Sequence, residues 1–171
     1  MTTLHSALVA GFFALLLTPL ARAEGEPADH PFLGYRQFTA RAGVGATFAP
    51  DTFAVAASVE YNLDRFLSFG PMLQAGFRSG RNLFILSGMG RLTAPLYATR
   101  RVEASFHTGP GVIFRESGGF NFRNFAYALG ADADVFVIRN LTCGLGMTLN
   151  LTSASGARTV WLATAGASYH F

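Results

Sequence analysis

From residue 37 to the end of the chain, apolar and polar residues alternate with a period of two, interrupted at intervals by turn residues. Successive side chains of a β-strand point to opposite faces, so this alternation predicts strands with one apolar and one polar face. The predicted strands cover 37–48, 52–63, 66–78, 83–93, 101–115, 125–137, 141–151 and 158–171. The fourth is the least regular, because Phe84, Ile85 and Leu86 place apolar side chains on both faces.

Eight strands joined by short connections predict an all-β fold, an eight-stranded antiparallel up-and-down barrel. Both ends of such a barrel chain lie on one side, and alternate connections lie on the other. The connections on the side away from the termini are expected near Ala49, Gly80, Gly119 and Ser155. The longest is expected over 116–124.

The alternation alone does not say which face of the barrel is inside. A soluble barrel encloses its apolar face, whereas a transmembrane barrel turns that face toward lipid and encloses the polar one. About ten residues per tilted strand suffice to span the hydrocarbon layer. An export signal, an aromatic C-terminus and a pattern of paired charges favour the transmembrane barrel.

Residues 1–23 have the features of a cleaved secretory signal peptide. An apolar core over 7–19 precedes the small-x-small cleavage pattern Ala21-Arg22-Ala23. The segment before that core lacks Lys and Arg, which is a departure from the usual pattern, and the apolar run is short for a membrane anchor. Residues 24–36 are then a periplasmic lead-in, and 37–171 form the barrel domain.

The last strand ends on an aromatic residue at the carboxyl terminus. Thr164, Gly166, Tyr169 and Phe171 resemble the C-terminal signal of outer-membrane barrels, with a polar residue, a glycine and two aromatics. Over 37–171 the chain resembles the small outer-membrane β-barrel family of the OmpA/OmpX type. The resemblance implies a monomer in the bacterial outer membrane, inserted by the barrel assembly machinery through these four positions, but it implies no particular activity.

The charged residues of the strands fall on the polar face. A buried charge without a partner is strongly unfavourable, so an enclosed polar face needs paired charges. Turn positions predict that Arg41 lies opposite Glu60, that Arg91 lies opposite Glu103, and that His107 lies near Asp132. The predicted lumen charge network comprises Arg41, Glu60, Arg91, Glu103, His107, Asp132 and Asp134.

Aromatic residues gather at the predicted strand ends, where a membrane barrel carries its interfacial girdles. One girdle is expected from Phe38, Tyr61, Tyr169 and Phe171, and the other from Phe48, Phe53, Phe77, Phe84, Phe114 and Trp161.

Composition narrows the possible partners and cofactors. All 13 basic residues are arginine, and they exceed the 10 acidic residues so slightly that nucleic-acid binding is not expected. Cys143 is the only cysteine, which excludes an internal disulfide. The four histidines are scattered, so neither a metal site nor a cofactor is expected.

The sequence offers no convincing catalytic constellation. Glu103, Ser105 and His107 share the polar face of one strand, but residues two apart on a strand lie about 7 Å from each other, too far for a nucleophile–base hydrogen bond. Outer-membrane lipid A deacylases use a His-x-Ser dyad, whereas His107 is followed by Thr108 and Gly109. An enzyme is therefore not expected.

The expected role is structural or interactive, in envelope integrity, adhesion or lipopolysaccharide contact. Outer-membrane lipid and lipopolysaccharide are the expected partners, and Arg81, Arg123 and Arg158 are candidates for bidentate contact with lipopolysaccharide phosphates. A lipid-modifying or proteolytic enzyme and a small-solute pore remain the alternatives.

Overall fold

A computed structural model describes residues 36–48, 51–78, 81–96, 101–116, 120–153 and 159–171 of the chain. The expected signal peptide and nearly all of the expected lead-in lie outside the described residues. Within the described ranges, no helix is long and apolar enough to cross a membrane.

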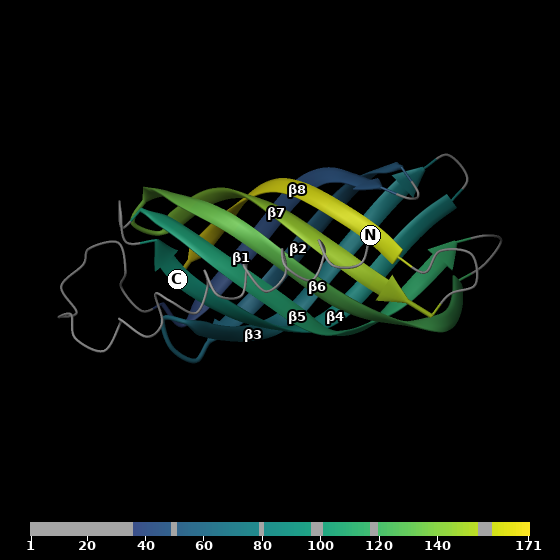
Figure 1. The fold of residues 1–171 in the computed structure, drawn as a ribbon, viewed down its shortest axis with the longest axis horizontal. Helices are drawn as coiled ribbons and strands as arrows, with labels where there is room; N and C mark the ends of the chain where they lie inside the picture. Colours follow the sequence, from purple (N-terminus) through teal and green to yellow (C-terminus); the bar gives the residue numbers. More distant parts are fainter. Residues whose placement is uncertain (1–35, 49–50, 79–80, 97–100, 117–119, 154–158) are drawn as a thin grey trace, which may run out of the picture.

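Eight antiparallel strands form one closed barrel, which confirms the predicted fold class (Figure 1). Each strand pairs with its neighbours in sequence, and the last strand pairs with the first. The strands are β1 (Phe38–Phe48), β2 (Thr52–Asn62), β3 (Leu67–Arg78), β4 (Arg81–Leu96), β5 (Val102–Glu116), β6 (Phe120–Ile138), β7 (Leu141–Thr152) and β8 (Thr159–His170).

The seam between β1 and β8 closes the barrel through a continuous ladder from Thr39↔His170 to Phe48↔Trp161. Beyond this ladder, the amides of Phe38 and Phe171 each donate to the other's carbonyl at 2.9 Å. Closure leaves no row of unpaired strand amides, which would cost several kcal/mol each in lipid.

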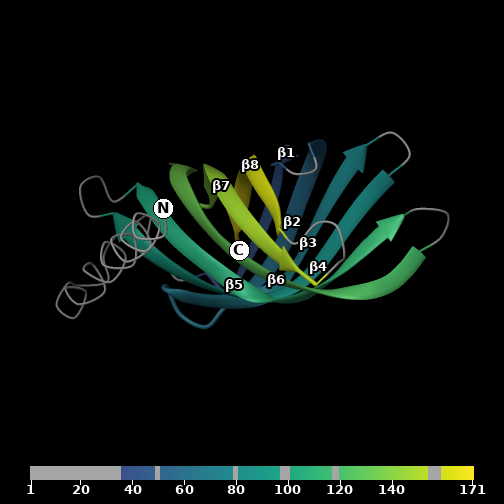
Figure 2. The same ribbon diagram turned by 45° about the vertical axis from the view of Figure 1, so that its right-hand side comes forward.

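The two ends of the barrel differ. The terminal mouth is the end at which β1 begins and β8 ends; the hairpin end is the opposite one, where β3 meets β4 and β5 meets β6. The β3–β4 and β5–β6 hairpins reach farthest at the hairpin end (Figure 2). Strands β4, β5 and β6 have 16, 15 and 19 residues, more than the roughly 9–11 that a tilted strand needs to span a bilayer.

The expected long loop over 116–124 is wrong. Glu116 ends β5 and Phe120 already begins β6, so strand pairing continues to Glu116↔Phe120. The pairing of β5 with β6 in this hairpin contains one register shift, between Ile113 and Phe114. The Gly- and Asn-rich sequence there looked like a loop, but the partner strand supplies hydrogen bonds that local propensity does not reveal.

The apolar face of the sheet is outside. Large apolar side chains are exposed along every strand, for example Leu145 at 69% and Phe53 at 57%. The charged strand residues point to the interior instead, where Glu60 is 1% and Arg91 is 3% exposed. This arrangement suits acyl chains outside and a polar lumen inside, and it is the reverse of a soluble barrel.

Aromatic rings cluster at the terminal mouth as the girdle prediction requires. Phe38 packs against Tyr61 at 5.4 Å and against Phe171 at 5.9 Å, and Tyr169 stacks on Phe171 at 6.0 Å between ring centroids. Toward the hairpin end, Phe48, Phe53, Phe77 and Trp161 are exposed on the outer face. Cys143 is exposed on the outer face of β7, between these two bands.

Candidate functional site

The lumen is filled by side chains in successive layers. Nearest the terminal mouth lies a charged layer, described below. Between the ends, Asn150 donates to Gln74 Oε1 at 2.8 Å, so β7 and β3 are linked across the lumen. Toward the hairpin end, the buried residues Leu83, Ile85, Ile113, Ala126 and Val160 form one apolar cluster.

Arg91 is the centre of the charged layer. Its Nε donates to both carboxylate oxygens of Glu60, at 3.0 and 2.9 Å, which joins β4 to β2. Its Nη1 donates to Ser105 Oγ at 2.8 Å and also pairs with Asp132 Oδ2. A single guanidinium therefore holds two carboxylates that come from strands on different sides of the lumen.

Arg41 extends the network from the first strand. Its Nη1 lies 2.6 Å from Asp134 Oδ2, and its Nε lies 3.5 Å from Glu60 Oε1. The path Asp134–Arg41–Glu60–Arg91–Asp132 therefore begins and ends on β6 and passes through β1, β2 and β4. Hydroxyl groups complete the coordination of Glu60, since Ser58 and Ser68 donate to it at 2.9 and 2.8 Å.

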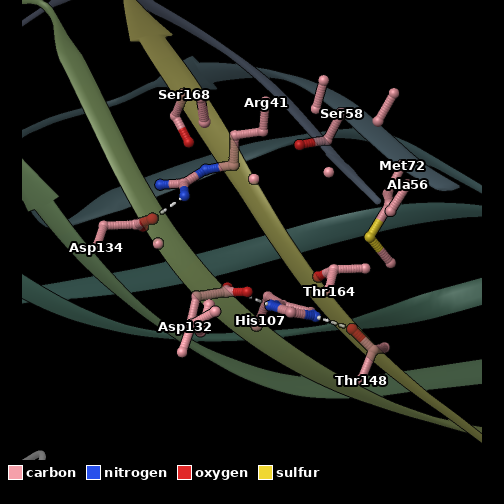
Figure 3. Close-up of a pocket in the computed structure, with 18 of the residues that line it drawn as sticks. Arg41, Ala56, Ser58, Met72, His107, Asp132, Asp134, Thr148, Thr164 and Ser168 are labelled. Atoms are coloured by element: carbon pink, nitrogen blue, oxygen red, sulfur yellow. Dashed lines mark hydrogen bonds and ion pairs between the residues drawn. The ribbon is translucent and has the colours of Figure 1, made fainter. Parts of the chain in front are cut away.

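His107 links this network to β7. Its Nδ1 lies 2.9 Å from Asp132 Oδ2, and its Nε2 lies 3.1 Å from Thr148 Oγ1 (Figure 3). A cavity of about 60 Å³ adjoins these groups. That volume holds roughly four water molecules.

The predicted cross-strand registers were shifted. Glu60 lies opposite Thr39 rather than Arg41, although Arg41 still reaches it on the diagonal. The pairing of Arg91 with Glu103 is wrong: Arg91 lies opposite His107, and Glu103 lies opposite Pro95. Strand β4 continues to Leu96, three residues beyond its predicted end, and this moves the turn and the whole register.

The prediction that His107 lies near Asp132 is confirmed by their contact at 2.9 Å, although the direct partner of His107 on β6 is Gly130. The register error at Arg41 amounts to two residues, since Ser58 and not Glu60 is its direct partner. Because the side-chain period of a strand is also two, such errors change the partner but not the face.

Glu103 differs from the other charged residues of the lumen. It lies directly opposite Asp134, a second carboxylate, and Arg41 is the cation that acts on it electrostatically. Among the described residues it forms no direct hydrogen bond or ion pair. The expectation that every inward charge is paired therefore fails at this position.

Three glycines make room for the charged side chains, and sequence inspection did not single them out. A Cβ atom at Gly146 would lie 2.2 Å from Asp132 Oδ1, one at Gly144 2.2 Å from Asp134 Oδ1, and one at Gly130 2.1 Å from His107 Nε2. Their inward position in the alternation was the available signal, but the side chain that fills each space comes from a neighbouring strand.

The four positions of the expected assembly signal are divided between the two faces of β8. Thr164 and Gly166 face the lumen, where a Cβ atom at Gly166 would lie 2.3 Å from the carbonyl oxygen of Ala42. Tyr169 and Phe171 are exposed on the outside. Recognition by an assembly machinery stays a prediction.

Two of the three candidate lipopolysaccharide contacts, Arg81 and Arg123, lie at or near the hairpin end. Arg81 is the first residue of β4, and Arg123 is the fourth residue of β6. Their side chains, and residue 158 as a whole, lie outside the described part, so these contacts stay a prediction.

Asp132, His107 and Thr148 form an acid–imidazole–hydroxyl row, the order used in nucleophilic catalysis. However, His107 and Thr148 are 1% and 6% exposed. The same Asp132 oxygen also pairs with Arg91, so it is not free to act on His107 alone. Within the described ranges, His, Cys, Asp and Glu residues form no group of three that could hold a metal ion.

Comparison with solved structures identifies the architecture. Neisserial surface protein A matches with a TM-score of 0.60 and 13% identity, over 78% of this chain and 96% of that one. The chain has the fold of the small eight-stranded outer-membrane barrels. The N-terminal β-barrel domain of Pseudomonas aeruginosa OprF matches with a TM-score of 0.58 and 13% identity, over 80% and 98%.

The outer membrane enzyme PagL matches with a TM-score of 0.52 and 13% identity, over 78% of this chain and 99% of that one. No family model matches the chain, and no curated protein matches it. At such low identity the likeness extends to the fold alone, and this fold is shared by a surface protein and an enzyme.

Proposed function

We propose that this chain spans the bacterial outer membrane as a closed, non-conducting and non-catalytic barrel with a structural or surface-interaction role. The observation that carries the proposal is the filling of the lumen. Charged side chains cross-link opposite walls near the terminal mouth, and the cluster of Leu83, Ile85, Ile113, Ala126 and Val160 closes the hairpin side.

The apolar cluster argues against a pore. A continuous water path needs polar groups or open space along the whole lumen, whereas here buried aliphatic side chains fill the space beside the Gln74–Asn150 pair. The projecting hairpins favour contact at the cell surface, since β4, β5 and β6 are longer than a membrane crossing requires.

The acid–imidazole–hydroxyl row is the observation that would favour an enzyme. Catalysis on lipid or protein needs a site that a large substrate can reach, whereas Thr148 lies buried inside the barrel. The row is better explained as a hydrogen-bonded link between β5, β6 and β7.

Single-channel recording in planar bilayers tests the closed lumen. The refolded protein is expected to give no steady conductance, and an Ile85→Gly/Leu162→Gly variant is expected to give measurable openings, because both removed side chains are buried in the hairpin half. Steady conductance of the unmodified barrel would refute the proposal.

Membrane insertion is tested through Trp161, the only tryptophan of the chain. Its exposed position on the outer face predicts quenching by lipids brominated on their acyl chains. Equal fluorescence in brominated and unbrominated vesicles would exclude the lipid-facing exterior.

A further inference from the structure

The terminal mouth contains a second cavity, of about 70 Å³, which adjoins the charged network, since Arg41 and Glu60 also line it. Arg36, Arg65 and Arg139 line it, from the residue before β1, the β2–β3 turn and the β6–β7 turn. Three segments far apart in sequence thus bring three guanidinium groups to one opening.

These arginines are held in place without carboxylate partners. Arg36 donates to Asn140 Oδ1 at 3.1 Å, and the Arg65 guanidinium lies 4.6 Å from the centroid of the Phe66 ring. Arg139 is exposed. Among the described residues none of the three forms an ion pair.

Asp64, which also lines the cavity, is bound through one carboxylate oxygen to the backbone of its own turn and forms no ion pair among the described residues. Asp64 Oδ1 accepts from the amides of Phe66 and Leu67, both at 2.7 Å. The guanidinium groups of the mouth are therefore available for an external oxyanion, which arginine binds through paired hydrogen bonds.

The same cavity is also lined by Glu103, the carboxylate of the lumen that lacks a direct ion pair. Its neighbour Asp134 is bound by Arg41, so Glu103 is the carboxylate left for an incoming cation. A ligand that fits this opening carries an anionic group for the three arginines and a cationic group for Glu103.

We propose that the terminal mouth binds a phosphate–ammonium zwitterion of the phosphoethanolamine type, with the phosphate on Arg36, Arg65 and Arg139 and the ammonium group toward Glu103. The group can come from a soluble ester or from a phospholipid head. This proposal goes beyond the structural role above and does not depend on whether the barrel conducts.

The test titrates the refolded full barrel, in a phosphate-free detergent, with phosphoethanolamine, inorganic phosphate and ethanolamine, followed by calorimetry. Phosphoethanolamine is expected to bind more tightly than either fragment. An Arg65→Gln/Arg139→Gln variant is expected to weaken it by roughly tenfold or more, the effect of losing charge-assisted hydrogen bonds.

Glu103→Gln separates a zwitterion site from a simple phosphate site. It is expected to weaken phosphoethanolamine binding severalfold while leaving inorganic phosphate binding equal or stronger, because a repelling carboxylate is removed. The matched control is Arg101→Gln, which removes an exposed guanidinium at the same end that does not line this cavity, and it is expected to leave both affinities unchanged.

The proposal is overturned if phosphoethanolamine binds no better than phosphate, if Glu103→Gln affects neither ligand, or if the control variant weakens binding as much. Nanodiscs of phosphatidylethanolamine and of phosphatidylglycerol identify the source of the group. If the ligand is a lipid head group, binding of soluble phosphoethanolamine should be suppressed in phosphatidylethanolamine nanodiscs only. If the ligand is a soluble ester, phosphoethanolamine should bind in both kinds of nanodisc.

Discussion

Arg91 on β4 and Glu60 on β2 face each other across the lumen, and the Arg91 Nε lies within 3.0 Å of both Glu60 carboxylate oxygens. The strand between them, β3, contributes Ser68 to the same carboxylate. The contact therefore joins strands that are not hydrogen-bonded neighbours, and it holds the barrel together across its interior as well as around its wall.

Removing the guanidinium of Arg91 should lower the stability of the barrel. Arg91→Met leaves the buried carboxylate of Glu60 with only the more distant Arg41 Nε, and it deprives Asp132 of its guanidinium partner. The expected loss of unfolding free energy is about 3–5 kcal/mol, measured by urea titration of the refolded barrel. Asp51→Asn, at an exposed turn, is the control and should change stability by less than about 0.5 kcal/mol. A loss equal to that of the control would mean that the network contributes nothing.

A lumen glycine and an exposed glycine of the outer face provide a matched pair of substitutions. Gly146→Ala places a methyl group 2.2 Å from Asp132 Oδ1, whereas Gly90→Ala adds one where no atom lies within 4 Å. The first should cost about 1–3 kcal/mol because the Asp132 side chain must move away from its partners. The second should stay within about 0.5 kcal/mol of the unmodified barrel. Equal unfolding curves for the two variants would contradict the tight packing of the network.

The lipid-facing exterior predicts a cost that depends on depth. Leu145 lies near the middle of β7 and is 69% exposed, and Val137 lies near the end of β6 and is 60% exposed. Leu145→Arg should lower the unfolding free energy in vesicles by about 2–4 kcal/mol, and Val137→Arg by about 0–1 kcal/mol. Similar costs for both variants would exclude a hydrocarbon layer centred on the barrel.

The expected assembly signal can be separated from ordinary packing. Phe171→Ala removes ring contacts with Phe38 and Tyr169. The unfolding free energy measured in detergent should therefore fall by about 0.5–1.5 kcal/mol for each aromatic pair lost. If the terminal aromatic is also recognised by the assembly machinery, the amount in the outer membrane of cells should fall much further. Phe48→Ala, exposed near the opposite end, is the control. Equal cellular amounts for both variants would remove the recognition role.

The alternation of residues predicted the faces of the strands correctly because side-chain direction in a strand depends only on position. Arg41, Glu60 and Asp132 could therefore be assigned to the interior once the apolar face was assigned to lipid. The prediction of a loop over 116–124 was wrong because the length of a strand depends on its partner as well as on its own residues. Hydrogen bonds from the partner strand extended β5 and β6 through residues with weak strand propensity.

The sequence by itself determined the number of strands, their antiparallel order and the side on which each residue lies, since these follow from a local period of two and from the spacing of turns. Only the tertiary structure decided which charges meet, because a partner across the lumen depends on the exact registers of all the strands between. Arg91 thus binds Glu60 and Asp132 rather than Glu103, and the arginines of the terminal mouth come together from three separate turns and strand ends.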